Sequence, residues 1–155
     1  MKIEIKCRFS GSILFSHEVE GNTTRLTLEA AVSARANLDG ANLDGANLDG
    51  ANLAGANLAR AYLAHAYLAG ANLDGANLDG EILTKAPISI LNLTWPVLIT
   101  EGFMRIGCQR HSHEEWKSFD DGAIQSMEDR ATEFWAQWKL PLLAMCDTHA
   151  TKELS

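Results

Sequence analysis

Residues 36–80 read ANLDG ANLDG ANLDG ANLAG ANLAR AYLAH AYLAG ANLDG ANLDG, nine pentapeptides without a gap. Alanine fills the first position of every unit, leucine fills the third, and seven of the nine units end in glycine. A fixed short period restricts the path of a backbone more than composition does. This stretch therefore decides the fold.

The five-residue period fits neither a helix nor a flat strand. Five residues advance a helix by about 500°, so successive leucines would lie about 140° apart around its axis. In a flat strand side chains alternate, so Leu38 and Leu43 would face opposite sides. Both can face one interior only if the chain turns a corner in every unit, where Asn, Asp and Gly are tolerated. The sequence predicts a β-solenoid with alanine and leucine inside and the other three positions outside.

These pentapeptides resemble those of the pentapeptide-repeat family, over about a third of the chain. The resemblance implies a right-handed quadrilateral β-helix with four units per turn, so that residues twenty apart stack in columns. About two and a quarter coils would then form roughly 11 Å of solenoid at the ~4.8 Å strand spacing. The segment after the repeats is also similar to C-terminal segments of phage and prophage members of the family.

The flanks predict two further parts, which divide the chain into 1–35, 36–85 and 86–155. Alternating residues in 2–9 and 13–19 predict a β-hairpin, and residues 22–35 predict a short helix. A solenoid end exposes unpaired strand edges, so we expect the hairpin and the helix to form an N-terminal cap.

Residues 86–155 predict an α+β module that caps the other end of the solenoid. Strand-like stretches occupy 88–93, 97–100 and 103–106. Ser112 begins a capping box with a short helix to about Phe119, and an amphipathic helix follows that Pro141 kinks or divides.

Charge and composition restrict the function. The chain has 155 residues with 20 acidic and 13 basic side chains, for a net charge of −7. Such a chain lacks the basic surface that direct nucleic-acid binding requires. No apolar run is long enough to span a membrane, and the N-terminus does not resemble a signal peptide. Three cysteines are typical of a reducing compartment, so we expect a cytoplasmic protein.

The outward acidic residues of the repeats suggest one function. Some members of the family mimic duplex DNA and bind type II topoisomerases, which the resemblance extends to this chain as one alternative. Duplex DNA carries one charge per ~1.7 Å, so about 11 Å of rod needs six or seven charges. The repeats offer five aspartates over several faces, and both mimicry and simple solubility stay open: Asp39, Asp44, Asp49, Asp74 and Asp79.

Four residues interrupt the uniform surface of the repeats: Arg60, Tyr62, His65 and Tyr67. Arginine and tyrosine are enriched in the hot spots of protein interfaces. We expect these four residues to contact a protein partner, together with the five aspartates. The alternative is that they contact the C-terminal module of the same chain.

Two Cys-x₂-His pairs raise the alternative of zinc: Cys108 with His111, and Cys146 with His149. Together they would supply four ligands of types that structural zinc sites use, although buried cysteines are more often core residues. Otherwise we expect no cofactor. No P-loop, nucleophile elbow or GxGxxG motif is present, and a Cys108 thiol beside His111 and His113 is the one catalytic arrangement to consider.

The last helix concentrates Phe134, Trp135 and Trp138 within five residues. Large aromatic side chains are favoured at the centres of protein interfaces, so we predict a homodimer through these three residues. The alternative is burial within the monomer, against Leu91, Leu93 and Val97.

Taken together, the sequence predicts a non-enzymatic acidic protein-binding module, derived from phage. Its expected partner is a bacterial nucleic-acid-handling or defence protein, inhibited by DNA mimicry in the manner of an anti-CRISPR protein. One alternative is a scaffold or dimerisation protein whose C-terminal module, stabilised by zinc, is the effector. The other is a topoisomerase-binding DNA mimic.

Overall fold

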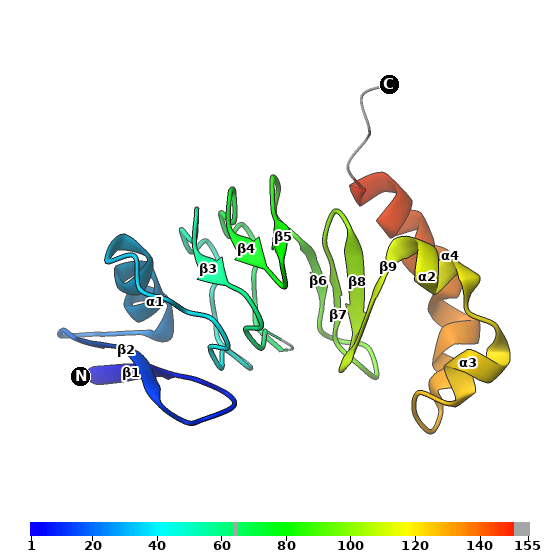
Figure 1. Ribbon diagram of the computed structural model, residues 1–155, viewed down its shortest axis with the longest axis horizontal. Coiled ribbons are helices and arrows are strands. Elements are labelled where there is room, and N and C mark those ends of the chain that lie inside the picture. The colour runs from blue at the N-terminus through cyan, green and yellow to red at the C-terminus, as the bar shows by residue number, and fades with distance from the viewer. Residues whose placement is uncertain (64, 151–155) are drawn as a thin grey trace. The chain divides into compact units, whose positions relative to one another are not determined.

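The computed structural model describes residues 1–63 and 65–150. The chain divides into two compact units, Met1–Ala86 and Pro87–Ser155 (Figure 1). The first unit holds the hairpin, one helix and the repeats, and the second holds a four-stranded sheet with three helices. Each unit has its own core.

The first unit begins with the predicted hairpin and helix. Strand β1 (Lys2–Lys6) pairs antiparallel with β2 (Ile13–Glu18), and α1 (Thr24–Ser33) packs against both. The Thr23 hydroxyl caps α1 by accepting a hydrogen bond from the Leu26 amide. Leu28 and Ala31, three residues apart on one face of α1, are fully buried.

The repeats form a coil that returns to the same position every twenty residues. Parallel bridges join Asn42 to Tyr62, Asn47 to Tyr67 and Asn52 to Asn72, and strand β3 (Asn57–Leu58) pairs in parallel with β4 (Asn77–Leu78). The spacing of twenty makes four units one turn. Each side of the coil contributes only one or two paired residues, so the solenoid consists of short bridges instead of long strands.

The repeat leucines fill the interior, as the five-residue period predicts. From Leu38 to Leu78 every one of them is at most 5% exposed. Asparagine shapes the corners: in units such as 37–39 and 52–54 its Oδ1 accepts a hydrogen bond from the amide two residues later. The Asn57 side chain also donates to Asn37 Oδ1 one coil below, at 3.0 Å.

The last unit of the repeat ends the coil by reversing the chain. Asp79 and Gly80 both have positive φ, 53° and 88°, and β4 pairs antiparallel with β5 (Glu81–Ile82). Positive φ at both residues of a two-residue Asp-Gly turn is typical of a type I′ hairpin. Leu83 follows as a buried residue whose amide donates to the Ala76 carbonyl, so the reversal covers the end of the leucine column.

The second unit is an antiparallel sheet with helices. Strands β6 (Ile88–Ile90), β7 (Val97–Ile99), β8 (Phe103–Ile106) and β9 (Gln109–Ser112) pair in chain order. Helices α2 (His113–Ser118), α3 (Asp121–Gln125) and α4 (Ala131–His149) follow. The capping box at Ser112 and Glu115 is confirmed. Strand β9 was not predicted, because the two-residue turn that precedes it is marked by a single glycine.

Pro141 does not divide the last helix, which was one of the two outcomes expected. Helix α4 continues through Pro141 over 19 residues. Proline removes one backbone N–H and crowds the preceding turn. Pro141 lies on the exposed side of α4, where water can hydrate the carbonyl that loses its partner.

Candidate protein-binding surfaces

Asp39 is held by the coil above it. The Arg60 guanidinium donates two hydrogen bonds to the Asp39 carboxylate, from Nε to Oδ1 at 2.9 Å and from Nη2 to Oδ2. This hydrogen-bonded guanidinium holds the pKa of Asp39 below its ordinary value. Arg60 has a φ of 55°, which is a left-handed conformation. In seven of the nine units glycine occupies the same, fifth position. A strained residue in a two-pronged ion pair indicates a specific structural role.

Two further aspartates of the first coil also bind the second coil. Asp44 Oδ1 accepts a hydrogen bond from the His65 amide at 3.2 Å and lies 2.7 Å from His65 Nδ1. Asp49 Oδ1 accepts from the Ala69 amide at 2.9 Å. With Asp39, three of the five repeat aspartates therefore hold successive coils together. Asp74 is exposed and makes no ion pair with any described residue.

The turn of the N-terminal hairpin contacts Arg60 and Tyr62. The Arg60 guanidinium lies 5.8 Å from the centre of the Phe9 ring. The Arg8 guanidinium lies 4.5 Å from the centre of the Tyr62 ring and 5.0 Å from that of Phe9. Phe9 in turn covers Gly40, where an added Cβ would lie 3.2 Å from two Phe9 ring carbons. A contact within the first unit thus explains two of the four interrupting residues. Sequence reasoning missed Arg8 and Phe9, because nothing in the repeat period indicates which column the hairpin would contact.

The other two interrupting residues lie further around the second coil. Tyr62 pairs with the Asn42 column and Tyr67 with the Asn47 column, so the two tyrosines lie on successive sides of the coil. Tyr67 is 53% exposed, and its ring contacts no other ring or cation among the described residues. Of the two tyrosines, Tyr67 presents the more accessible ring.

The structure does not gather the two Cys-x₂-His pairs into a metal site. Cys108 is exposed in the β8–β9 turn, while Cys146 is buried with its Sγ 3.8 Å from the Met104 Sδ. Burial raises the pKa of Cys146 to about 11, which disfavours the thiolate that zinc requires. The His111 ring packs edge-on against Trp116. Within residues 1–63 and 65–150, no three His, Cys, Asp or Glu side chains, His149 included, lie close enough to hold a metal.

The interface residues predicted in the last helix lie mostly in the core. Phe134 and Trp135 are 6% and 4% exposed, and the Trp135 ring lies 5.2 Å from that of Trp116. In the single chain these two side chains are therefore core residues, and a dimer interface through them stays a prediction. Trp138 is half-buried against the same core. The large apolar side chains that α4 exposes are Leu140, at 80%, and Met145, at 36%.

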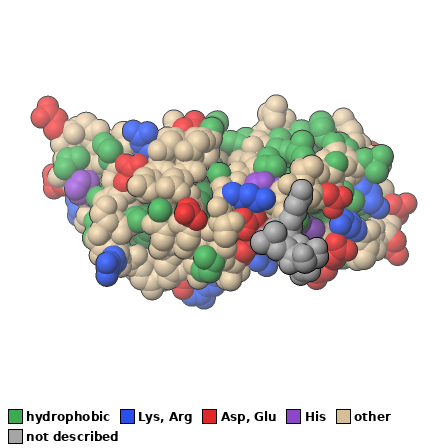
Figure 2. Space-filling model, turned by 90° about the horizontal axis from the view of Figure 1, so that it is seen from above, with side chains coloured by type: hydrophobic (Ala, Val, Ile, Leu, Met, Phe, Trp, Pro, Cys, Tyr) green, Lys and Arg blue, Asp and Glu red, His purple; other side chains and the backbone are tan. Residues whose placement is uncertain are grey.

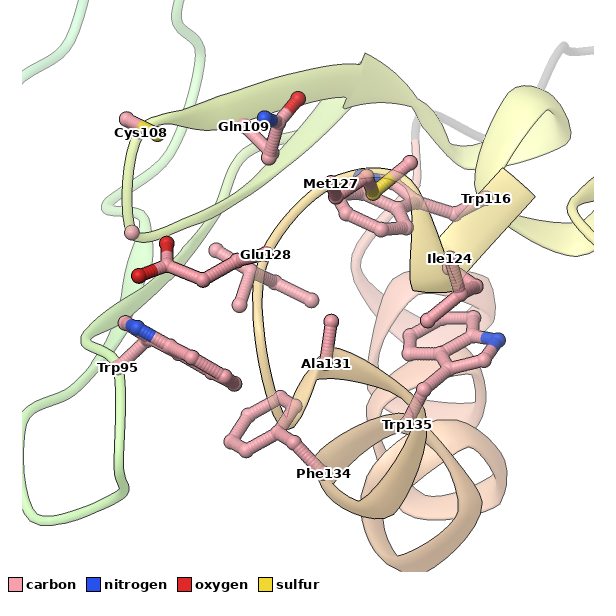
Figure 3. A pocket seen from close by; sticks show the side chains of 12 residues that line it. Trp95, Cys108, Gln109, Trp116, Ile124, Met127, Glu128, Ala131, Phe134 and Trp135 are labelled. Atoms are coloured by element: carbon pink, nitrogen blue, oxygen red, sulfur yellow. The ribbon is translucent and has the colours of Figure 1, made fainter. Parts of the chain in front are cut away.

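An apolar pocket opens in the second unit between the β8–β9 turn, the segment after α3 and helix α4 (Figure 3). Its floor includes Trp95, Ile106, Met127 and Phe134, and it holds about 40 Å³ of space. Glu128 is its one acidic lining residue. In Figure 3 the Glu128 side chain extends toward the β8–β9 turn, above the Trp95 ring. Sequence reasoning did not find this pocket, because its residues come from four separate segments.

The arrangement of charge can be followed on the face that Figure 2 shows. On this face acidic side chains are interspersed with basic ones and with neutral surface. Mimicry of a phosphate backbone requires regularly spaced negative charge. The arrangement on this face instead favours local charge pairing.

The coil defines a class of protein, the β-solenoids built from very short repeats. Comparison with protein families gives the particular family: the model described as pentapeptide repeats matches residues 34–66 and 56–86, with 8 copies. Residues 34–86 therefore belong to the pentapeptide-repeat family. Such repeats are typical of interaction modules, and no catalytic family matches the chain.

No curated protein and no solved structure matches the chain significantly. Among the helices of the described residues, none combines the length and the apolar character needed to cross a membrane.

Proposed function

We propose that this protein is a non-enzymatic protein-binding module that docks on a basic surface of its partner. Basic surfaces are typical of nucleic-acid-handling proteins, which include many bacterial defence proteins. One observation carries the proposal: Asp121, Glu128 and Asp129 in the second unit are exposed and make no ion pair with any described residue. A protein of net charge −7 that leaves these carboxylates unpaired favours a cationic partner.

In this proposal the repeats are a rigid scaffold, and the hairpin and α1 cap their first coil. Three contacts support the cap. Glu29 Oε1 accepts from the Asn52 amide at 2.9 Å, Arg25 donates to the Asp49 carbonyl at 3.1 Å, and the Arg8 amide donates to the Gly40 carbonyl at 2.8 Å. We also infer, from the family resemblance, that the coil is right-handed.

Mimicry of duplex DNA by the repeat aspartates is the weaker form of the proposal. Asp39, Asp44 and Asp49 bind the second coil, so their charge is partly committed within the protein. The short coil also offers a topoisomerase only a small binding surface. We therefore place the partner-directed charge in the second unit, with Asp74 and Tyr67 as the contacts that the repeats offer. Phage origin and anti-CRISPR-like inhibition stay predictions.

Capture of partners from bacterial lysate tests the proposal. We expect the full chain to retain a partner in about 50 mM salt and to lose it in about 500 mM, because screening shortens the range of charge attraction from above 10 Å to below 8 Å. The variant Asp121→Asn/Glu128→Gln/Asp129→Asn should lose the partner at low salt. A control that removes exposed charge elsewhere, Glu18→Gln/Glu20→Gln, should keep it. Retention that is indifferent to salt and to the triple variant would contradict the proposal.

A further inference from the structure

The pocket of the second unit has an apolar floor whose aromatic rings contact each other. The Trp95 and Phe134 rings meet edge to face with their centres 5.1 Å apart. Trp95 also lies against Gly107, where an added Cβ would come within 3.3 Å of Trp95 Cδ1. Gly107 has a φ of 56°, which the β8–β9 turn requires and which glycine adopts without strain. Trp95 thus contacts both the β8–β9 turn, at Gly107, and helix α4, at Phe134.

The enclosed space of the pocket is small. It is about 40 Å³, against the about 300–1,000 Å³ of typical small-molecule sites. The pocket is open on one side, with Glu128 and Gln109 among its lining residues (Figure 3). A shallow apolar floor of this size fits one side chain that lies across it.

The one charged residue that lines the pocket is acidic, while Lys139 lies 5.8 Å from the ring of the lining residue Trp135. Glu128 lines the pocket without an ion pair in the described part of the chain, and Asp129 follows directly. The next residue, Arg130, lies 3.7 Å from the Glu133 carboxylate and is thereby partly neutralised. Over residues 87–150 the sequence has nine acidic and five basic residues. This charge favours a cationic occupant.

We propose that this pocket binds an arginine side chain of a basic partner segment. The aliphatic stem would cover the Trp95 and Phe134 rings, and the guanidinium would donate to the Glu128 carboxylate. Arginine fits better than lysine, because its planar group stacks on aromatic rings and pairs with a carboxylate through two hydrogen bonds. The inference rests on the proposed function and assigns its site.

A titration of the ¹⁵N-labelled full chain tests the inference. The probe is a synthetic Gly/Ser peptide with three arginines, and the readout is the indole N–H signal of Trp95, assigned with Trp95→Phe. We expect a saturable shift of this signal with the arginine peptide. Glu128→Gln should weaken binding by about threefold to fivefold, as loss of a solvent-exposed charge-assisted pair implies, while Glu20→Gln should change it less than about twofold.

Several outcomes would overturn the pocket assignment. These are an unmoved Trp95 signal, equal binding of a peptide with leucine in place of arginine, and equal effects of Glu128→Gln and Glu20→Gln. The two proposals also fail separately. A lysate partner that binds Glu128→Gln as well as the wild type, but not Asp121→Asn/Asp129→Asn, overturns the pocket and leaves the proposed function standing. Absence of any salt-sensitive partner overturns the proposed function itself.

Discussion

The two units carry similar charge and use it differently. Residues 1–86 contain ten acidic and seven basic side chains, and residues 87–155 contain ten and six. In the repeats, Asp39, Asp44 and Asp49 bind the next coil. In the second unit, Glu128 and Asp129 have no ionic partner within the described residues. Net charge alone therefore does not identify a binding surface; what matters is whether each carboxylate already has a partner.

The two cores differ as well. The solenoid interior repeats one leucine and one alanine per unit, whereas the second unit packs a mixed core around Trp116, Trp135 and Phe134. In the solenoid interior a charged side chain would lack a partner at the leucine position of any unit. A mixed core depends on a few large side chains, so the two units should respond differently to substitution.

The largest effect is expected for Leu58→Asp. Leu58 is fully buried in the column, and an aspartate there has no cationic group to pair with. We expect a loss of more than about 4 kcal/mol, enough to unfold the first unit. Circular dichroism during urea unfolding measures it. A folded Leu58→Asp protein would contradict the inward assignment of the leucines.

Trp135→Ala should come next, at about 3–5 kcal/mol, as for other large buried aromatic residues. Leu140→Ala on the exposed side of the same helix should cost less than about 0.5 kcal/mol. Denaturant unfolding of both variants compares them. Light scattering on the wild type separately tests the homodimer, which stays a prediction; a monomer of 16.9 kDa would exclude it.

The sequence predicted the solenoid because a five-residue period leaves few alternatives. It also predicted the hairpin, α1 and the capping box at Ser112, where local patterns agree with the tertiary structure. It did not predict the site. The contact of Arg8 with Tyr62 and the pocket at Trp95 depend on which distant segments meet, and no local pattern records that.

The aromatic cluster of α4 also shows that local sequence patterns do not predict which segments meet. Spacing identified Phe134 and Trp135 as one apolar face, but spacing does not distinguish an interface from a core. The β-sheet that covers this face decides the question, through residues such as Val97 and Met104. Long-range packing therefore accounts for what sequence reasoning missed.

A smaller effect separates two substitutions of Arg60. Both Arg60→Gly and Arg60→Ala remove the pair with Asp39, but only glycine adopts a φ of 55° without strain. We expect Arg60→Gly to be more stable than Arg60→Ala by about 1 kcal/mol. Gly45→Ala is the matched control, since its φ is 67° and nothing lies within 4 Å of an added Cβ. It should cost a similar amount in thermal unfolding.

The smallest effect is the pH dependence of the Asp39 pair. Arg60 lowers the pKa of Asp39 in the folded protein, so the pair contributes stability above the unfolded pKa of about 3.9. That contribution is lost as the pH falls through the lower, folded pKa. A carboxyl titration by NMR should find the pKa of Asp39 closer to its ordinary value in Arg60→Ala. An unchanged pKa would show that Arg60 is not the cause.

The central claim is that the charge of the repeats is structural and the charge of the second unit is partner-directed. Two triple variants, each measured for thermal unfolding and for partner capture at low salt, test it directly: Asp39→Asn/Asp44→Asn/Asp49→Asn and Asp121→Asn/Glu128→Gln/Asp129→Asn. We predict that the first variant loses thermal stability and keeps the partner, and that the second keeps its stability and loses the partner. The reverse pattern, with capture lost only in the repeat variant, would contradict the claim.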